Sequence, residues 1–186
     1  DFRTLIQSSR ENDIGLCIEP IKYYLDKLPN KKNVTKVNYA LSSKSAEIKI
    51  YWVTPQDIVK YKLPNWVRGC NSINNPHPTI KKMLGDKHDD IITVDVINSI
   101  TWGQLIKEYE IKSIDYLKVD TEGHDGLILL EYYKECVVNP RLKANTILFE
   151  NNILRDSELV EEVIDKFNNF GYKGEHIGDD YKLTKL

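Results

Sequence analysis

The sequence has 186 residues, of which 41% are apolar, so it is long and apolar enough to fold as one globular domain (1–186) with a sizeable core. Its formal net charge of -2, with basic residues interleaved among acidic ones, gives no indication of a nucleic-acid partner or a membrane surface. No apolar run approaches the ~20 residues needed to cross a bilayer, and three widely separated cysteines (Cys17, Cys70 and Cys136) favour a reducing, cytoplasmic compartment.

The spacing of apolar residues predicts strands and helices that alternate along most of the chain. Residues 46–53 place Ile48, Ile50 and Trp52 on one face, which indicates an antiparallel or edge strand. In chain order the predicted elements are a helix at 2–9, a strand at 14–18, a helix at 20–28 that Pro20 can open, strands at 34–41, 46–53 and 91–97, a helix at 101–109, a strand at 114–119, a helix at 127–133, a strand at 146–150, a helix capped by Asp156 and ending near Phe170, and a hairpin of strands at 172–177 and 181–186.

Residues 55–85 show no sustained period and contain several Pro and Gly residues, which predicts a long loop. Loops of this length inside compact domains are usually functional. This one carries aromatic and polar groups suited to gripping a polar ligand, and we expect Trp66, Ser72 and His77 to contact the substrate. The alternative is a mobile surface excursion without a binding role.

The alternation of strands and helices predicts an α/β fold with a mostly parallel sheet, helices on both faces and a C-terminal antiparallel hairpin. Three of the predicted strands end in an acidic residue, namely Glu19, Asp120 and Glu150. Parallel strands bring their carboxyl ends to one rim of the sheet, where ligands bind in open α/β sheets. The sequence therefore predicts that these three carboxylates gather around one ligand.

The strand at 114–119 runs into a polar loop that holds Asp120, Glu122, His124 and Asp125. Four ionisable groups in a packed interior would be costly, which favours a functional loop. The alternative is a solvated loop in which Asp125 is only the N-cap of the next helix.

Glu19 suits the ribose diol of a nucleoside cofactor, since an acid at the end of the second strand commonly accepts those hydrogen bonds. A helix-capping role is the alternative. The glycine-rich turn that normally precedes such an acid is missing, because the sequence begins inside the helix that would follow it. We therefore expect the first, central strand to be absent from this sequence and the natural polypeptide to extend N-terminally.

Five blocks of the sequence resemble the FkbM-type S-adenosylmethionine-dependent methyltransferases. Their order and spacing agree over nearly the whole chain, and the Asp-x-Glu-Gly block after an Ile-Asp-x-Leu-Lys strand is the most specific of them. The blocks are Gly15–Pro20, Val37–Ser42, Ile114–His124, Ile147–Glu150 and Gly171–Tyr172.

The resemblance implies a Rossmann-like methyltransferase sheet and methylation of a hydroxyl, often on a sugar or glycosylated product, with S-adenosyl-L-methionine as the cofactor. It also implies roles for individual residues. On the matching positions, Glu19 with Pro20 would hold the ribose, Ala40, Leu41 and Ser42 would border the adenine, Asp120 would lie by the reacting methyl, and Glu122 and His124 would line the substrate side.

A sugar hydroxyl is a weak acid, so its methylation benefits from a base or a metal. Asp120 is the first candidate for the base and His124 the second, since a neutral imidazole accepts protons near neutral pH. Glu150 faces the same rim, where it can contact the substrate or bind a divalent cation together with Asp120.

Three other functions agree with parts of the pattern. One is another nucleotide-using α/β enzyme, such as an NAD oxidoreductase. A second is a non-catalytic methyltransferase-like binding module. The third is a metal hydrolase that uses Asp120, Glu122 and His124, although ligands from one short loop give poor geometry for a closed metal site.

Overall fold

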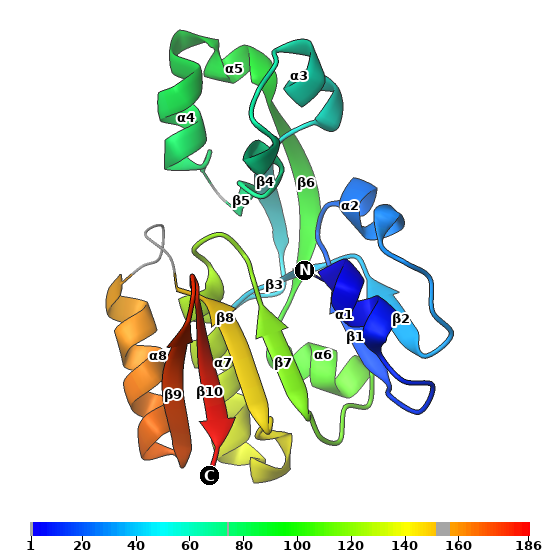
Figure 1. Cartoon of the computed structure of the whole chain (residues 1–186), viewed down its shortest axis with the longest axis vertical. Coiled ribbons are helices and arrows are strands. Elements are labelled where there is room, and N and C mark those ends of the chain that lie inside the picture. Colours follow the sequence, from blue (N-terminus) through cyan, green and yellow to red (C-terminus); the bar gives the residue numbers. More distant parts are fainter. Residues whose placement is uncertain (1, 74, 152–156) are drawn as a thin grey trace.

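The computed structural model of the chain describes residues 2–73, 75–151 and 157–186, and it has a mixed α/β architecture (Figure 1). The helices are α1 (Phe2–Ser8), α2 (Lys22–Lys27), α3 (Pro55–Lys60), α4 (Pro78–Leu84), α5 (His88–Ile91), α6 (Trp102–Glu108), α7 (Asp125–Val138) and α8 (Ser157–Asn169), with short 3-10 helices η1 (Asn65–Arg68), η2 (Gly85–Lys87) and η3 (Pro140–Leu142). The strands are β1 (Gly15–Ile18), β2 (Val34–Val37), β3 (Ala40–Leu41), β4 (Glu47–Val53), β5 (Ser72–Ile73), β6 (Ile92–Ile100), β7 (Tyr116–Val119), β8 (Thr146–Glu150), β9 (Tyr172–Ile177) and β10 (Asp180–Lys185).

Within the described residues the strands pair in three groups, in the orders β1-β2, β7-β8-β10-β9 and β3-β6-β4-β5. The pairs β1–β2, β3–β6 and β7–β8 are parallel, and the remaining pairs are antiparallel. The C-terminal hairpin of β9 and β10 is confirmed, and so is the antiparallel pairing of β4. The expectation of a mostly parallel sheet is wrong, because β4 and β6 form a long antiparallel ladder and the hairpin extends β8.

One face of the sheet β7-β8-β10-β9 holds the main core. Ile147 and Phe149 of β8 are fully buried on that face, together with residues of α6, α7 and α8. The opposite face carries the partly exposed Tyr116 and an ion pair between Lys182 and Glu175. The buried residues of β8 and β10 therefore alternate along each strand and lie on the face that packs against α6, α7 and α8. No helix in the described ranges has the length and apolar character that a membrane span requires.

The segment predicted to be a loop folds into a compact lobe, and that prediction is wrong. We call residues 54–91 the inserted lobe, which contains α3, η1, β5, α4, η2 and α5 between β4 and β6 (Figure 1). Pro55 and Pro78 begin helices and do not break them, with Thr54 and His77 as the residues that cap those helices. The lobe has its own apolar core of Val53, Ile58, Val67, Cys70, Ile80 and Ile91.

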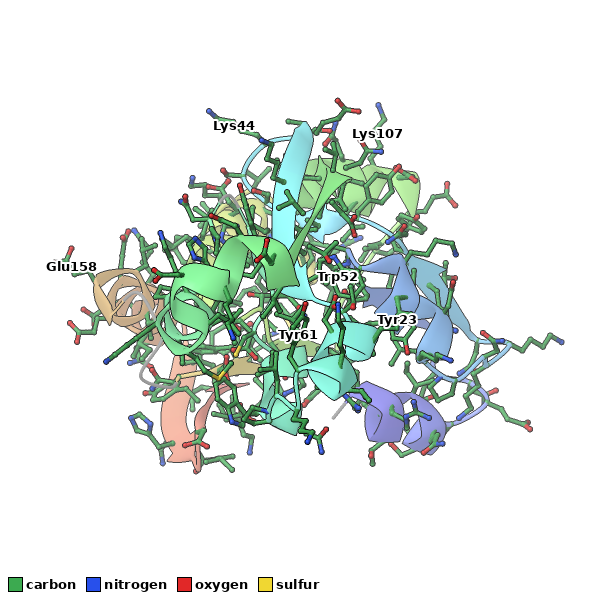
Figure 2. All side chains as sticks on the ribbon, turned by 90° about the horizontal axis from the view of Figure 1, so that it is seen from above. Tyr23, Lys44, Trp52, Tyr61, Lys107 and Glu158 are labelled. Atoms are coloured by element: carbon green, nitrogen blue, oxygen red, sulfur yellow. The ribbon has the colours of Figure 1, made fainter. Side chains whose placement is uncertain are left out.

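The ribbon of β4 and β6 packs against α2 through aromatic rings. The ring centroid of Trp52 lies 5.7 Å from that of Tyr24 and 6.4 Å from that of Tyr23 (Figure 2). The indole Nε1 of Trp52 also donates a hydrogen bond to Asp95 Oδ2 at 2.8 Å. These contacts join the inserted lobe's base to the helix that follows β1.

Two predicted boundaries in the N-terminal part differ from the structure. The helix expected to open at Pro20 begins at Lys22, because a turn separates it from β1. The strand expected at 34–41 is broken, since the Asn38 side chain donates to the backbone carbonyls of Glu19 and Pro20. The first piece then pairs with β1 and the second with β6. The predicted cap Asp156 lies outside the described residues.

Gly126 lies in the first turn of α7, where that helix passes close to α8. A Cβ added there would lie 2.9 Å from the Cβ of Leu159, which cannot move without its helix. We expect Gly126→Ala to lower the free energy of unfolding by about 1–3 kcal/mol, the usual cost of overpacking. Gly103→Ala is the matched control, because its added Cβ would meet only the flexible carboxyl end of Glu135, at 2.9 Å. Chemical denaturation measures both, and equal stability of the two variants would contradict this close packing.

Candidate active site

A cavity of about 240 Å³ runs along β1 and β7 to their carboxyl ends. Much of its wall is apolar, with Leu16 and Ile18 from β1, Leu117 and Val119 from β7, and Trp102 from α6. Of the residues predicted to bind the cofactor or act in catalysis, the cavity is lined by Glu19, Pro20, Ala40, Leu41, Asp120, Glu122 and His124.

Five other predicted site residues are not among those that line this cavity, namely Ser42, Trp66, Ser72, His77 and Glu150. Ser42 follows β3, where its backbone N–H donates to the carbonyl of Ile100. Trp66 of η1 is half exposed, whereas His77 is only 3% exposed. His77 and Glu150 nevertheless each come within 4.8 Å of the Glu122 carboxyl through one ligating atom.

Glu19 follows β1 and fixes the turn that leads to α2. Its Oε1 accepts a hydrogen bond from the backbone N–H of Ile21 at 2.8 Å. Ile21 is the N-cap of α2 and makes no side-chain cap bond, so Glu19 orders the turn before the helix. Burial raises the pKa of Glu19 to about 7, and the Ile21 hydrogen bond acts in the opposite direction. The carboxyl that this turn holds in place also lines the cavity.

The loop after β7 is a tight turn that redirects Glu122. Glu122 and Gly123 have φ values of 52° and 96°, and His124 N donates to Thr121 O at 3.4 Å, as in a type I′ turn. A non-glycine residue in this region costs of order 1–3 kcal/mol and persists where its surroundings hold it. Asp125 does so here, since its Oδ2 accepts from Thr121 N at 3.1 Å and from Thr121 Oγ1 at 2.8 Å.

Asp125 is therefore not the N-cap of the following helix, as the alternative interpretation of this loop expected. It is the first residue of α7, and the N-cap is His124, which makes no side-chain cap bond. Burial lowers the pKa of His124 and keeps its imidazole neutral. Its Nε2 is buried without a hydrogen-bond partner among the described residues, so it can serve a ligand in the cavity.

The acids at the three strand ends fall into two overlapping groups. Glu19 and Asp120 line the same cavity, and carboxyl oxygens of Asp120, Glu122 and Glu150 lie within 4.8 Å of one another. Burial raises the pKa of Glu122 to about 7, with repulsion from Glu150, Asp120 and Asp125 adding to the effect. A carboxyl with this pKa is half ionised near neutral pH, which suits proton transfer.

Asp120 differs from Glu122 because it has a cationic partner. Lys118 Nζ lies 3.1 Å from Asp120 Oδ2 and 4.0 Å from Asp180 Oδ2. The Lys118 side chain is 9% exposed, and that of Asp120 is 34% exposed. The Asp120 carboxyl is therefore held in an ion pair with Lys118, whereas Glu122 has no such cationic partner among the causes of its raised pKa.

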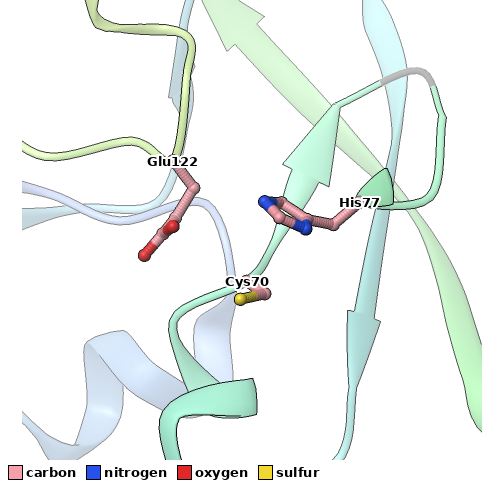
Figure 3. Close-up of side chains that lie close together, drawn as sticks. All are labelled: Cys70, His77 and Glu122. Atoms are coloured by element: carbon pink, nitrogen blue, oxygen red, sulfur yellow. The ribbon is translucent and has the colours of Figure 1, made fainter. Parts of the chain in front are cut away.

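Two groups of side chains have the spacing of metal ligands. One is Asp120, Glu122 and Glu150, and the other is Cys70, His77 and Glu122 (Figure 3). Carboxylates gather at strand ends without an ion as well, so these distances alone assign no metal. The expected divalent site of Asp120 and Glu150 stays a prediction.

The sequence model of the methyltransferase FkbM domain matches residues 3–173. The chain belongs to the FkbM methyltransferase family. No curated protein and no solved structure matches it significantly. The resemblance inferred from the sequence blocks is thereby confirmed, and membership of this family implies a methyltransferase, an enzyme class that generally uses S-adenosylmethionine.

The cavity of this FkbM methyltransferase includes residues that the sequence did not point to. Gly69, Asn71 and Ile73 reach it from the inserted lobe, and Tyr24 and Lys118 line it from α2 and β7. The Tyr24 hydroxyl is buried with no hydrogen-bond partner in the described part of the chain. The lobe residues were missed because Pro55 and Pro78 were interpreted as breaks, although each follows a helix-capping residue.

Proposed function

We propose that the chain is an S-adenosylmethionine-dependent O-methyltransferase that modifies a hydroxyl of a sugar or glycoconjugate. The observation that carries this proposal is that Glu19 and Glu122 line one cavity and that each has a pKa raised to about 7. An acid at the position of Glu19 suits the ribose diol of a nucleoside. A carboxyl such as Glu122 suits removal of a hydroxyl proton near neutral pH.

The residues around the cavity fit this cofactor. Glu19 offers a carboxyl to the ribose, and Ala40 and Leu41 offer an apolar border to the adenine. The carboxyl of Asp120 complements the positively charged groups of the cofactor. Ligand contacts at the carboxyl ends of β1 and β7 are those of a Rossmann-like methyltransferase, which is the fold that we infer.

The acceptor side of the cavity favours a neutral polyol. Asn71 supplies both a donor and an acceptor, which suits sugar hydroxyls, and Ile73 supplies an apolar surface. Lys118 is the one basic side chain among the described lining residues, and it is paired with Asp120. The surplus of carboxyls disfavours phosphorylated or carboxylated acceptors, because like charges repel in a partly buried site.

Glu122 suits the role of proton acceptor in this geometry. It lines the cavity, it is surrounded by other acids, and its pKa lies near neutral pH. Asp120 forms an ion pair with Lys118, and from this position it can orient both the Lys118 ammonium and the cofactor. We therefore assign the base to Glu122 and a positioning role to Asp120, with the neutral His124 beside them.

The chemistry of transfer divides between the cofactor and the chain. When bound, the cofactor supplies an electrophilic methyl group on a sulfonium sulfur. Glu19 accepts the hydrogen bonds of the ribose, and the inserted lobe orients the acceptor through Asn71. Glu122 accepts the hydroxyl proton as the acceptor oxygen attacks, so the chain mainly aligns the reactants and removes one proton.

Calorimetric titration with S-adenosylhomocysteine and, separately, with NADH tests the cofactor class. We expect S-adenosylhomocysteine to bind and NADH not to bind. In chemical unfolding, S-adenosylhomocysteine at about 100 times its Kd should add about 2.7 kcal/mol to the free energy of unfolding. Binding of NADH alone would identify a nicotinamide enzyme and refute the proposed function.

Transfer of a labelled methyl group from S-adenosylmethionine to a panel of neutral and anionic sugars tests the reaction. We expect methylation of neutral sugars. Cofactor binding without transfer to any member would favour a non-catalytic binding module. Excess chelator in the active reaction tests the predicted cation between Asp120 and Glu150, since unchanged rates exclude that cation, whereas lost activity shows that the reaction needs a metal.

A further inference from the structure

Glu122 is the contact between the loop after β7 and the inserted lobe. Its carboxyl lies against Gly69, where an added Cβ would come within 2.8 Å of Glu122 Oε1. Gly69 has an ordinary helical backbone conformation, with φ −80° and ψ −25°. Glycine is therefore not needed at position 69 for its backbone conformation. The absence of a side chain there leaves the space that the Glu122 carboxyl fills.

His77 faces the same carboxyl from the start of α4. Its Nδ1 accepts a hydrogen bond from Thr79 N at 3.3 Å, so the proton of the neutral ring is on Nε2. Figure 3 shows the outer edge of the ring directed towards Glu122, and one ligating atom of each of Cys70, His77 and Glu122 lies within 4.8 Å of the others. The ring therefore presents an N–H group to the carboxyl.

Cys70 does not compete for this role. Its thiol points to the carbonyl of Trp66, with Sγ 3.9 Å from that oxygen. Burial raises the pKa of Cys70 to about 11, with Glu122 and Glu150 adding to the effect, so the thiol stays protonated. The thiol is thus already directed to Trp66, which leaves the His77 ring as the group of the inserted lobe that can donate to Glu122.

We propose that His77 and Gly69 of the inserted lobe position the Glu122 carboxyl for proton transfer, His77 by donating its Nε2–H and Gly69 by leaving the space. This inference rests on the proposed function, in which Glu122 is the base. The acceptor oxygen gives its proton to Glu122 as it bonds to the methyl carbon, and the electrons of the broken carbon–sulfur bond stay on sulfur. His77 is thus a positioning residue, and the lobe couples acceptor binding to the base.

The charges around Glu122 set the direction of the expected effect. Acids surround it on the sheet side, and the neutral His77 N–H and Cys70 thiol face it from the lobe. A donor to the ionised form lowers the pKa of a carboxyl, so loss of the His77 donor should raise it. The surrounding acids are Asp120 after β7, Glu150 at the end of β8 and Asp125 at the start of α7.

Gly69→Ala is the first test, because it displaces the Glu122 carboxyl and leaves the fold intact. The added methyl group meets the flexible end of one side chain, which can move aside. We expect kcat to fall about 100-fold, the scale of a misplacement of about 1 Å, with unchanged affinity for S-adenosylhomocysteine. Gly103→Ala is the control, since it displaces the carboxyl of Glu135 in the same way outside the cavity. Wild-type kcat in Gly69→Ala would overturn the proposal.

The dependence of kcat/KM on pH tests His77 separately. We expect His77→Phe to move the acid limb to higher pH by about one unit, and His77→Gln, which keeps an N–H donor near Nε2, to retain the wild-type limb. An identical limb in all three proteins would overturn the proposal, as would zinc bound in stoichiometric amount to the wild type. A wild type that transfers no methyl group at all would refute the proposed function, whereas an active wild type with unaffected variants refutes only the positioning.

Discussion

Glu122→Gln is expected to reduce kcat at least about 100-fold, the usual lower bound for removal of a general base. The amide has the size of the carboxyl and fits against Gly69, but it cannot accept a proton. The neutral amide also removes the repulsion between the Glu122 carboxyl and the three acids around it. The free energy of unfolding should therefore not fall. Steady-state kinetics at neutral pH with a neutral sugar acceptor measures the effect.

Asp120→Asn is the comparison that makes this result specific. It leaves Lys118 without its nearest carboxylate, so we expect weaker cofactor binding and a smaller loss of kcat. The opposite pattern, with an inactive Asp120→Asn and an active Glu122→Gln, would return the base to Asp120. As a control, Glu122→Gln should bind S-adenosylhomocysteine with unchanged affinity, which would show that its cavity is intact.

Glu19→Gln is expected to weaken binding of S-adenosylhomocysteine by between about 10- and 150-fold, the equivalent of one charge-assisted hydrogen bond. The amide oxygen can still accept from Ile21 N, so the turn after β1 is preserved. The amide nitrogen cannot accept from a ribose hydroxyl, which is where the affinity is lost. Calorimetry measures the loss, and unchanged affinity would remove Glu19 from the cofactor site.

The pH dependence of cofactor affinity follows from the same carboxyl. The pKa of Glu19 is about 7 in the free protein, and ribose hydroxyls bind its ionised form. Below that pH the carboxyl must lose a proton on binding, so affinity should fall about tenfold per pH unit and level off above it. Glu19→Gln should lack this dependence, and a wild type with flat affinity below pH 7 would show that Glu19 binds in its protonated form.

The strands that hold the acids could be predicted from the sequence for a simple physical reason. The segment before Glu19 is a short apolar run that ends abruptly at the acid, and the segment before Asp120 is apolar at most positions, both of which are typical of a buried strand. The parallel register of β7 with β8 brings Asp120 and Glu150 to the same edge, and Glu19 lines the same cavity as Asp120 from the end of β1. Local pattern was therefore sufficient for this part of the site.

The pairing of β4 with β6 and the inserted lobe could not be predicted in the same way. A period of two shows that 46–53 is a strand, but it does not say which strand lies beside it. Pro55 and Pro78 are compatible both with a loop and with the first turn of a helix. The buried Val67 and Ile80, which show that the segment has its own core, become meaningful only once its helices are placed.

The proposed role of Glu122 was the least accessible to sequence reasoning. It rests on the nearness of Gly69 and His77, which lie about fifty residues earlier in the chain. The one local signal was Gly123, since glycine at the second position of a turn permits the positive φ that redirects the preceding residue. The sequence alone favoured Asp120 as the base, because it ends the strand directly.

A structure of the chain with S-adenosylhomocysteine bound is the most direct test of the account. We expect the ribose hydroxyls to lie within hydrogen-bonding distance of the Glu19 carboxyl, and the sulfur to lie in the same cavity, facing Glu122. A ligand bound elsewhere, or one whose sulfur is turned away from Glu122, would contradict it.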